Sequence, residues 1–229
     1  MRSVIRRRST RCPQCQLTLR WCLCDALRPL ETPLALALLT HPRERFRPTS
    51  SGNLIPRVFP ACRQQQWDTR QPPRPEELLV QERECWILHP LGQPLPTVPP
   101  DPATLQVLLL DGAWTEAATL ARGVKHWGRL VSLPLSGESR FWLRAKHEAE
   151  RFSTAEALMY LLNYLGLHSE ARELQAQFEL LVYAALRARG RTDLATSFLE
   201  GSILLEAMPD TLARLQAKRP RQGEEGYPG

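Results

Sequence analysis

The apolar run over residues 105–110, which stops at Asp111 and Gly112, is the feature that most constrains the fold of this chain. A run without polar alternation is typical of a strand that is buried on both faces. Such strands belong to sheets that helices cover on both sides. A small, helix-prone segment follows at once, so the run predicts a central strand of an α/β sheet and a helix after it.

Strands and helices alternate along the rest of the chain. We expect further strands over 33–40, 85–90 and 129–133, and helices from near Ser51 and over 114–123, 153–166, 169–189 and within 193–207. The Pro-rich stretches 71–75 and 94–102 predict a turn and a rigid loop. Leu174, Phe178, Leu181 and Ala185 have the spacing of an amphipathic helix. The alternation predicts a mainly parallel α/β sheet, and the chain has no internal repeats.

Polar residues follow the predicted strands where they end. In open α/β sheets this edge is where ligands bind. Asp111 and Trp114 suit a cationic or planar ligand, but the alternative is that Asp111 caps the next helix and Trp114 lies in the core. His41, after the first strand, is interpreted as a hydrogen-bonding loop residue because no triad partner is evident.

Ser153 and Glu156 have the spacing of a capping box, which predicts that they cap the start of a helix. A helix N-terminus also suits an anionic ligand group, so both interpretations stay open. The glycine-rich phosphate loops GxGxxG and GxxxxGK[ST] are absent, and so is the GxSxG motif that carries a nucleophilic serine.

Four cysteines lie close together with the spacing C-x2-C-x6-C-x-C, namely Cys12, Cys15, Cys22 and Cys24. Four thiolates can close a tetrahedral zinc site and order a short segment that has no core of its own. Disulfides or a redox pair are the alternatives; we favour zinc because nothing indicates secretion or a thioredoxin-like setting. Cys62 and Cys85 stand alone and are predicted to be small buried apolar residues.

The formal net charge is +6, and nearly all of the basic residues are arginines. Arginine pairs with phosphate through two hydrogen bonds and stacks on bases, which favours a nucleic-acid partner. The alternative is that the frequent use of arginine reflects only the base composition of the coding DNA. The clustered candidates for RNA contact are Arg6, Arg7, Arg8, Arg11, Arg43, Arg45 and Arg47.

The chain has 229 residues, 43% of them apolar, which is enough for one sizeable core. We expect a basic zinc-binding segment over 1–30, an α/β catalytic domain with C-terminal helices over 31–217, and a disordered tail over 218–229. No stretch approaches the roughly 18 apolar residues of a membrane span. The basic N-terminus lacks a signal-peptide core, so we expect a cytoplasmic protein without a membrane partner.

An ordered set of short motifs resembles the DTW-domain family over roughly residues 12–165. After the cysteines come His41-Pro42-x-Glu44, Thr49–Leu54, Leu110-Asp111-Gly112-Ala113-Trp114, Leu133-Pro134, Ser139–Arg144 and Ser153–Ala157. The sequence departs from the family at Ala113, where the motif has Thr or Ser. A catalytic role that depends on that hydroxyl is therefore not expected here.

The resemblance implies a tRNA-uridine aminocarboxypropyltransferase. Such an enzyme moves the 3-amino-3-carboxypropyl group of S-adenosylmethionine to N3 of a uridine, and uridine 47 of the tRNA variable loop is the expected acceptor. The resemblance also implies a SPOUT-like fold with a C-terminal trefoil knot, which is one of the rare exceptions to unthreaded topology.

The resemblance further implies a site for S-adenosylmethionine made by Thr40, Leu110, Asp111, Gly112, Trp114, Leu133, Pro134, Ser153 and Thr154. The sulfonium is already a good leaving group, so the protein mainly has to position the reactants, which is worth ~7–11 kcal/mol. Asp111 is the candidate base for the N3 proton; alternatively it holds the donor's ammonium or orients the loop. Trp114 is predicted to lie against adenine or the sulfonium, a contact worth ~0.5–2 kcal/mol.

Two other functions stay open. One is a non-catalytic, zinc-bearing RNA-binding module, which would not bind S-adenosylmethionine. The other is a SPOUT-type RNA methyltransferase, which would transfer the methyl group instead. The sequence predicts neither the oligomeric state nor the tRNA species.

Overall fold

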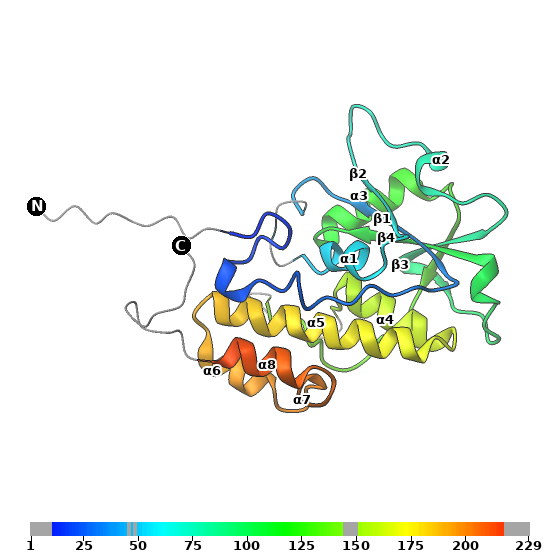
Figure 1. The fold of residues 1–229 in the computed structure, drawn as a ribbon. Helices are drawn as coiled ribbons and strands as arrows, with labels where there is room; N and C mark the ends of the chain where they lie inside the picture. Colours follow the sequence, from blue (N-terminus) through cyan, green and yellow to red (C-terminus); the bar gives the residue numbers. More distant parts are fainter. Residues whose placement is uncertain (1–10, 45–46, 48–49, 144–150, 218–229) are drawn as a thin grey trace, which may run out of the picture.

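A five-stranded sheet forms the centre of the molecule in the computed structural model, which describes residues 11–44, 47, 50–143 and 151–217 (Figure 1). The strand order is β2-β1-β4-β3-β5, and every neighbouring pair is parallel. The strands are β1 (Ala35–Thr40), β2 (Arg63–Gln66), β3 (Glu84–Pro94), β4 (Leu105–Asp111) and β5 (Arg129–Ser132). The predicted α/β class and parallel sheet are confirmed.

Eight α-helices are found in the described residues: α1 (Ile55–Val58), α2 (Pro75–Leu78), α3 (Trp114–Val124), α4 (Thr154–Tyr164), α5 (His168–Ala188), α6 (Thr192–Phe198), α7 (Leu204–Ala207) and α8 (Pro209–Gln216). Three short 3-10 helices are η1 (Leu19–Trp21), η2 (Gly52–Leu54) and η3 (Pro102–Thr104). The predicted helices are confirmed, and the helical stretch expected within 193–207 is divided between α6 and α7. The disordered tail predicted over 218–229 lies outside the described residues.

Strand β4 lies at the centre of the sheet, and all of its residues are buried. Successive side chains of a strand point to opposite faces. Val107 and Leu109 therefore pack with α4 and α5 on one face, whereas Leu108 and Leu110 pack with α3 on the other. The sheet is covered by helices on both sides, as the apolar run predicts.

Two strand predictions need correction. Strand β2 was not predicted, because its sequence Arg-Gln-Gln-Gln has no apolar signal; it is an edge strand, held by pairing with β1. Strand β3 is longer than the predicted strand and continues to Pro94 after an irregularity between Leu88 and Gln93. Its extension pairs with β5 alone, so the predicted rigid loop begins one residue later.

The cysteine-containing segment lies along α5 and next to the C-terminal helices (Figure 1). Cys12, Leu17 and Leu23 are buried in the same core cluster as α5. Arg20 Nη2 donates to the carbonyls of Leu215 and Ala217, at 2.9 and 2.7 Å, beyond the end of α8. The two ends of the described chain are therefore joined by hydrogen bonds. No helix in the described part is both long and apolar enough to cross a bilayer.

Candidate functional site

The carboxylate of Asp111 lies buried where three segments meet at the carboxyl end of β4. Only 4% of the residue is exposed. Ser50 Oγ donates to Asp111 Oδ2 at 2.7 Å, and Thr154 Oγ1 donates to Oδ1 at 2.9 Å. The aspartate thereby connects β4 with the turn that precedes η2 and with the first residue of α4.

Gly52 completes this arrangement, because its backbone amide also hydrogen-bonds Asp111. A Cβ atom at position 52 would lie 2.2 Å from Asp111 Cγ and 2.4 Å from each carboxylate oxygen. Only glycine therefore lets the main chain approach the carboxylate this closely. The role of Ser50 and Gly52 was not predicted; the Ser-Ser-Gly sequence after the first strand was the available signal.

Burial raises the pKa of Asp111, while the hydrogen bonds from Ser50, Thr154 and Gly52 act in the opposite direction. Burial also raises the pKa of nearby Glu44, with the charge of Asp111 as the next cause. The site therefore holds a carboxyl group whose proton affinity is higher than that of an exposed aspartate. A raised pKa suits a group that takes a proton near neutral pH.

The alternative in which Asp111 caps the next helix and Trp114 belongs to the core is wrong. Ala113 is the N-cap residue of α3, and the Trp114 side chain is 42% exposed. At this cap a Thr or Ser hydroxyl would accept a hydrogen bond from the first turn of the helix, which Ala113 cannot do. The other half of a capping box is present, since Ala113 N donates to Glu116 Oε2 at 2.8 Å. The Ala113 departure thus removes a helix cap.

A group of charged side chains lies on the β1 side of Asp111. His41 Nδ1 and Arg43 Nη1 each lie 3.4 Å from Glu116 Oε1. Burial opposes ionisation of Glu116, yet its pKa is lowered, by the Ala113 amide and then by His41. Arg47 Nη1 donates to the buried Glu44. His41 is a hydrogen-bonding loop residue, as interpreted from the sequence, since its Nδ1 accepts from Arg43 N at 3.4 Å.

A cleft of about 320 Å³ opens beside Asp111, between residues 88–90 of β3, the end of β4 and the N-terminus of α4. Its volume is at the lower end of the range for small-molecule sites, roughly 300–1,000 Å³. Five of the predicted donor-site residues line it: Leu110, Trp114, Leu133, Ser153 and Thr154. Leu88, His89, Pro90 and Phe152 also line it and were not predicted.

The other predicted donor-site residues lie around the cleft without lining it. Asp111 is hydrogen-bonded to Thr154, which lines the cleft. Thr40 of β1 is the strand partner of Asp111 in β4. Gly112 follows Asp111, and Pro134 follows Leu133. The predicted capping box is confirmed, since Ser153 Oγ accepts from Glu156 N and Ser153 N donates to Glu156 Oε2.

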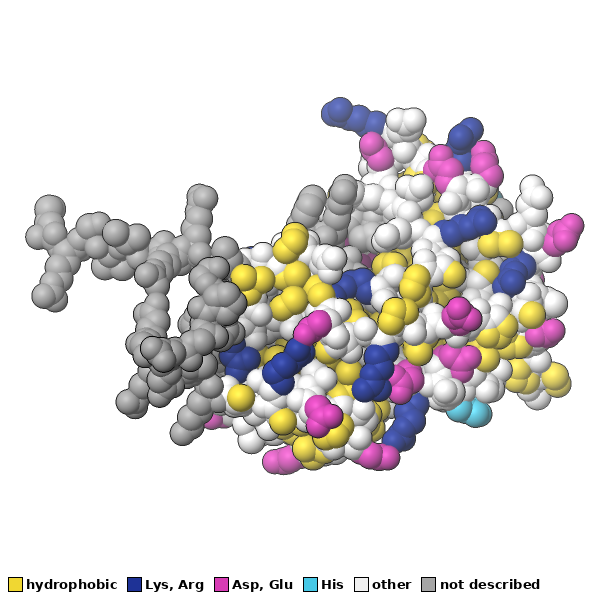
Figure 2. All heavy atoms as spheres, in the orientation of Figure 1, with side chains coloured by type: hydrophobic (Ala, Val, Ile, Leu, Met, Phe, Trp, Pro, Cys, Tyr) yellow, Lys and Arg dark blue, Asp and Glu magenta, His cyan; other side chains and the backbone are white. Residues whose placement is uncertain are grey.

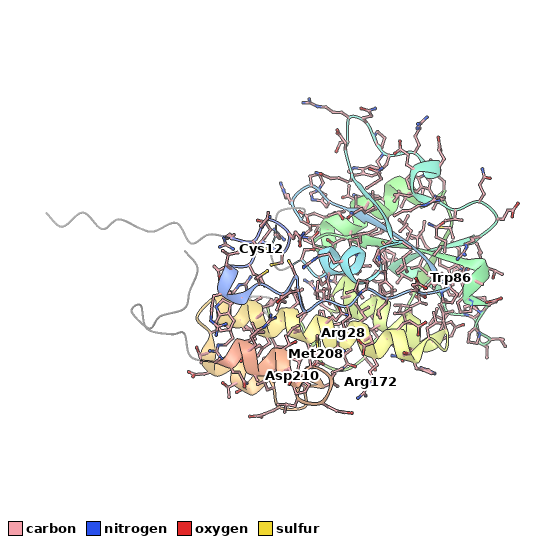
Figure 3. All side chains as sticks on the ribbon, viewed as in Figure 1. Cys12, Arg28, Trp86, Arg172, Met208 and Asp210 are labelled. Carbon is pink, nitrogen blue, oxygen red and sulfur yellow. The ribbon has the colours of Figure 1, made fainter. Side chains whose placement is uncertain are left out.

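The four cysteines predicted to bind metal are brought together. Their sulfur atoms all lie within 4.8 Å of one another, with Cys12 Sγ 3.5 Å from Cys24 Sγ and Cys15 Sγ 3.8 Å from Cys22 Sγ (Cys12 is labelled in Figure 3). Sulfurs bound to zinc at 2.3 Å in a tetrahedron are about 3.8 Å apart. All six cysteines are free, and the lone Cys62 and Cys85 are buried as predicted. The arrangement fits zinc.

The electrostatics around the sulfurs also suit a cation. Backbone hydrogen bonding, first from Cys15, lowers the pKa of Cys12 to about 6. Burial raises the pKa of Cys22 and of Cys24. Arg57 Nη2 donates to Cys24 Sγ at 3.2 Å. The chain thus stabilises part of the negative charge that four thiolates would carry, and a divalent cation would neutralise more of it.

The arginines predicted to bind RNA are only partly described. Arg6, Arg7, Arg8 and Arg45 lie outside the described residues. Arg43 and Arg47 lie near the carboxyl end of β1, with side chains 75% and 54% exposed, whereas Arg11 lies in the cysteine segment. On the face seen in Figure 2, basic and acidic side chains are interspersed.

Residues 9–186 match the family model described as the DTW domain. The match includes the four cysteines, Asp111 and its three hydrogen-bond donors, and the cleft. It ends within α5, so α6, α7 and α8 follow it. No solved structure matches the chain.

Proposed function

Because the chain belongs to the DTW-domain family, which is the family of tRNA-uridine aminocarboxypropyltransferases, we propose that it transfers the 3-amino-3-carboxypropyl group of S-adenosylmethionine to a tRNA uridine. The acceptor atom is N3, and the proposed acceptor is uridine 47. The observation that carries the proposal is the cleft that Leu110, Trp114 and Thr154 line beside the buried carboxylate of Asp111. This cleft lies at the edge of a parallel sheet where ligands bind.

The reaction needs orientation more than activation. N3 attacks the γ-carbon of the donor, the bond from that carbon to sulfur breaks, and its electron pair neutralises the sulfonium as methylthioadenosine leaves. The proton of N3 goes to a base. The exposed face of Trp114 suits the donor's adenine or sulfonium, and the apolar walls from Leu110 and Leu133 suit its adenosine.

We propose Asp111 as the base. A carboxylate has about four acceptor positions, and Ser50, Thr154 and Gly52 use three of them. Because Asp111 itself does not line the cleft, the N3 proton reaches it through the Thr154 hydroxyl, which lines the cleft and donates to Oδ1, and the raised pKa supports this role. The alternative is a positioning role, in which Asp111 fixes Thr154 and the Gly52 turn around the donor. A base predicts an acidic limb in the pH profile of kcat that Asp111→Asn abolishes; a positioning residue predicts an unchanged limb.

The cysteine segment is proposed to bind structural zinc and, with Arg11, Arg43 and Arg47, to contact the tRNA backbone. Phosphate contacts of this kind make binding depend steeply on salt. We further propose the SPOUT-like, knotted topology. The all-parallel sheet supports it, and a crystal structure that traces the chain between β5 and α4 tests it.

Donor labelling tests the reaction. Wild-type protein is incubated with unmodified tRNA and S-adenosylmethionine labelled either in the methyl group or in the carboxypropyl chain. We expect only the carboxypropyl label to enter tRNA, and nuclease mapping to locate it at uridine 47.

Incorporation of the methyl label alone would favour an RNA methyltransferase. If neither label enters tRNA, and calorimetry detects no binding of S-adenosylmethionine, the zinc-bearing RNA-binding module is the better description. Transfer at another uridine would preserve the reaction and correct the position.

A further inference from the structure

A second cavity, of about 270 Å³, lies between α4, α5 and the segment that follows β5. Leu135 and Phe152 line both this cavity and the donor cleft, so the two adjoin at the N-terminus of α4. None of the predicted site residues lines the second cavity. Its volume is below that of the donor cleft and suits a small group.

The charged side chains of this cavity contact one another and nearby backbone groups. Arg140 Nη2 donates to the Phe198 carbonyl at 2.6 Å and Nη1 to the Glu200 carbonyl at 3.3 Å, while Nε lies 3.8 Å from Glu179. Glu179 also accepts from Gln175 Nε2 at 2.9 Å and from Ile203 N at 3.1 Å. Both Nη atoms are therefore engaged, and the buried Nε is the one donor without a hydrogen-bond partner among the described residues, so no two-nitrogen fork is open to a ligand carboxylate.

Glu156 is equally occupied. Its oxygens accept from Ser139 Oγ at 2.9 Å, from Arg140 N at 2.7 Å and from Ser153 N at 2.7 Å. A ligand ammonium would have to displace these donors. The zwitterionic end of an amino acid, which needs both an anion and a cation partner, is thus poorly served by this cavity.

The surfaces that remain for a ligand are flat and neutral. Phe152 and Tyr160 contribute aromatic walls. The Gln175 carbonyl oxygen and the Ser136 hydroxyl add neutral polar groups. Aromatic walls with a few neutral polar groups are typical of sites that hold an unstacked base.

We propose that this second cavity holds the base of the acceptor nucleotide, while the first cleft holds S-adenosylmethionine. The inference rests on the proposed function. A transfer between two substrates requires their reacting atoms to meet, and two cavities that share Leu135 and Phe152 at one helix N-terminus provide that proximity. The carboxypropyl chain then passes the shared wall toward the base.

Filling the cavity tests this assignment. Ser136→Trp places a large side chain at an exposed position of its rim, and Tyr160→Ala removes an aromatic wall. Glu138→Trp, in the same loop but outside the cavity, is the matched control. We expect the two cavity variants to keep the affinity for S-adenosylmethionine in calorimetry and to lower kcat/KM for tRNA about 5- to 150-fold, as for the loss of one stacked base.

Photocrosslinking gives a readout that does not need transfer. Wild-type protein is irradiated with tRNA that carries 5-bromouridine at position 47 only, and the attached peptide is identified by mass spectrometry. A crosslink to Phe152 or Tyr160 supports the base site, even if the wild type transfers nothing and the proposed function fails.

A crosslink to a distant segment would overturn the inference. So would a cavity variant that loses affinity for S-adenosylmethionine to the same extent as activity on tRNA, because the cavity would then hold the donor's chain. Unchanged kinetics in both cavity variants would likewise overturn it.

Discussion

The Asp111 centre and the cysteine cluster differ in how their polar groups are provided with partners. The Asp111 centre gathers polar groups from distant parts of the chain, whereas the four cysteines come from the short segment 12–24. Asp111 is provided with donors by the chain itself, through Ser50, Thr154 and Gly52. The cysteine sulfurs lie mainly against one another, with Arg57 as a cationic neighbour of Cys24.

The two centres obtain their stability from different sources. Buried polar groups need partners, and the Asp111 centre is complete once the sheet and α4 have formed. Four clustered thiolates would repel one another, so in the zinc proposal a cation from outside the chain stabilises the cysteine segment. We therefore expect the first centre to tolerate metal removal and the second to respond weakly to substitutions near Asp111.

Metal removal is expected to have the largest effect. Structural zinc contributes about 10–16 kcal/mol of binding free energy in small zinc-binding peptides. A chelator, or Cys15→Ser, should make residues 11–30 sensitive to protease while S-adenosylmethionine still binds in calorimetry. Elemental analysis should find about one zinc per chain in the wild type. Cys62→Ala is the control and should keep the metal; a wild type that folds without metal would contradict the zinc assignment.

Asp111→Asn should lower kcat about 10²–10⁴-fold, as for the loss of a general base. The contribution of Asp111 to stability depends on pH. Burial raises the pKa of Asp111 in the folded state, so its contribution to the free energy of unfolding falls as the pH rises from the ordinary carboxyl range through the raised value. Urea unfolding from pH 4 to pH 8 should show this decrease in the wild type but less of it in Asp111→Asn.

Gly52→Ala should destabilise the protein by about 1–3 kcal/mol, because the new Cβ overlaps the Asp111 carboxylate. Chemical denaturation measures the loss. The same substitution in an Asp111→Ala background is the control, and there the cost should be smaller because the overlapping group is absent. Equal costs in both backgrounds would show that the close approach to Asp111 is not what requires glycine.

Ala113→Thr is expected to have the smallest effect and to be favourable. A Thr at the N-cap of α3 should raise the free energy of unfolding by about 0.5–2 kcal/mol and leave kcat unchanged. Ala118→Thr, within the same helix, should instead lower stability by a few tenths of a kcal/mol. A rise in kcat for Ala113→Thr would mean that the family's hydroxyl takes part in the reaction.

The sequence allowed prediction of those parts of the fold that have a local pattern. The apolar run of β4, the capping box of α4 and the periodicity of α5 each determine their own element. Strand β2 has no such pattern, because an edge strand of glutamines forms only through pairing with β1. Helix α8 was also missed, although Pro209 and the spacing of Leu212 and Leu215 were available as signals.

The site was predictable in location but not in its connections. Asp111 and the Ser153–Thr154 turn were identified from sequence, and the structure brings them together. The Ser-Ser-Gly sequence was visible, but the contact of Ser50 with Asp111, 61 residues away, follows from tertiary packing and has no local pattern. The second cavity escaped prediction for the same reason, since its walls come from α4, α5 and the loop after β5.

The hydrogen bonds of Arg140 have a consequence for how this protein can be divided or shortened. Arg140 lies inside the family match, yet the carbonyls that hold its guanidinium belong to Phe198 and Glu200, beyond the end of that match at residue 186. Arg20, at the other end of the chain, depends in the same way on Leu215 and Ala217. The unit that sequence similarity recognises is therefore smaller than the unit that folds, and a chain cut at the family boundary would lose the acceptors for both arginines.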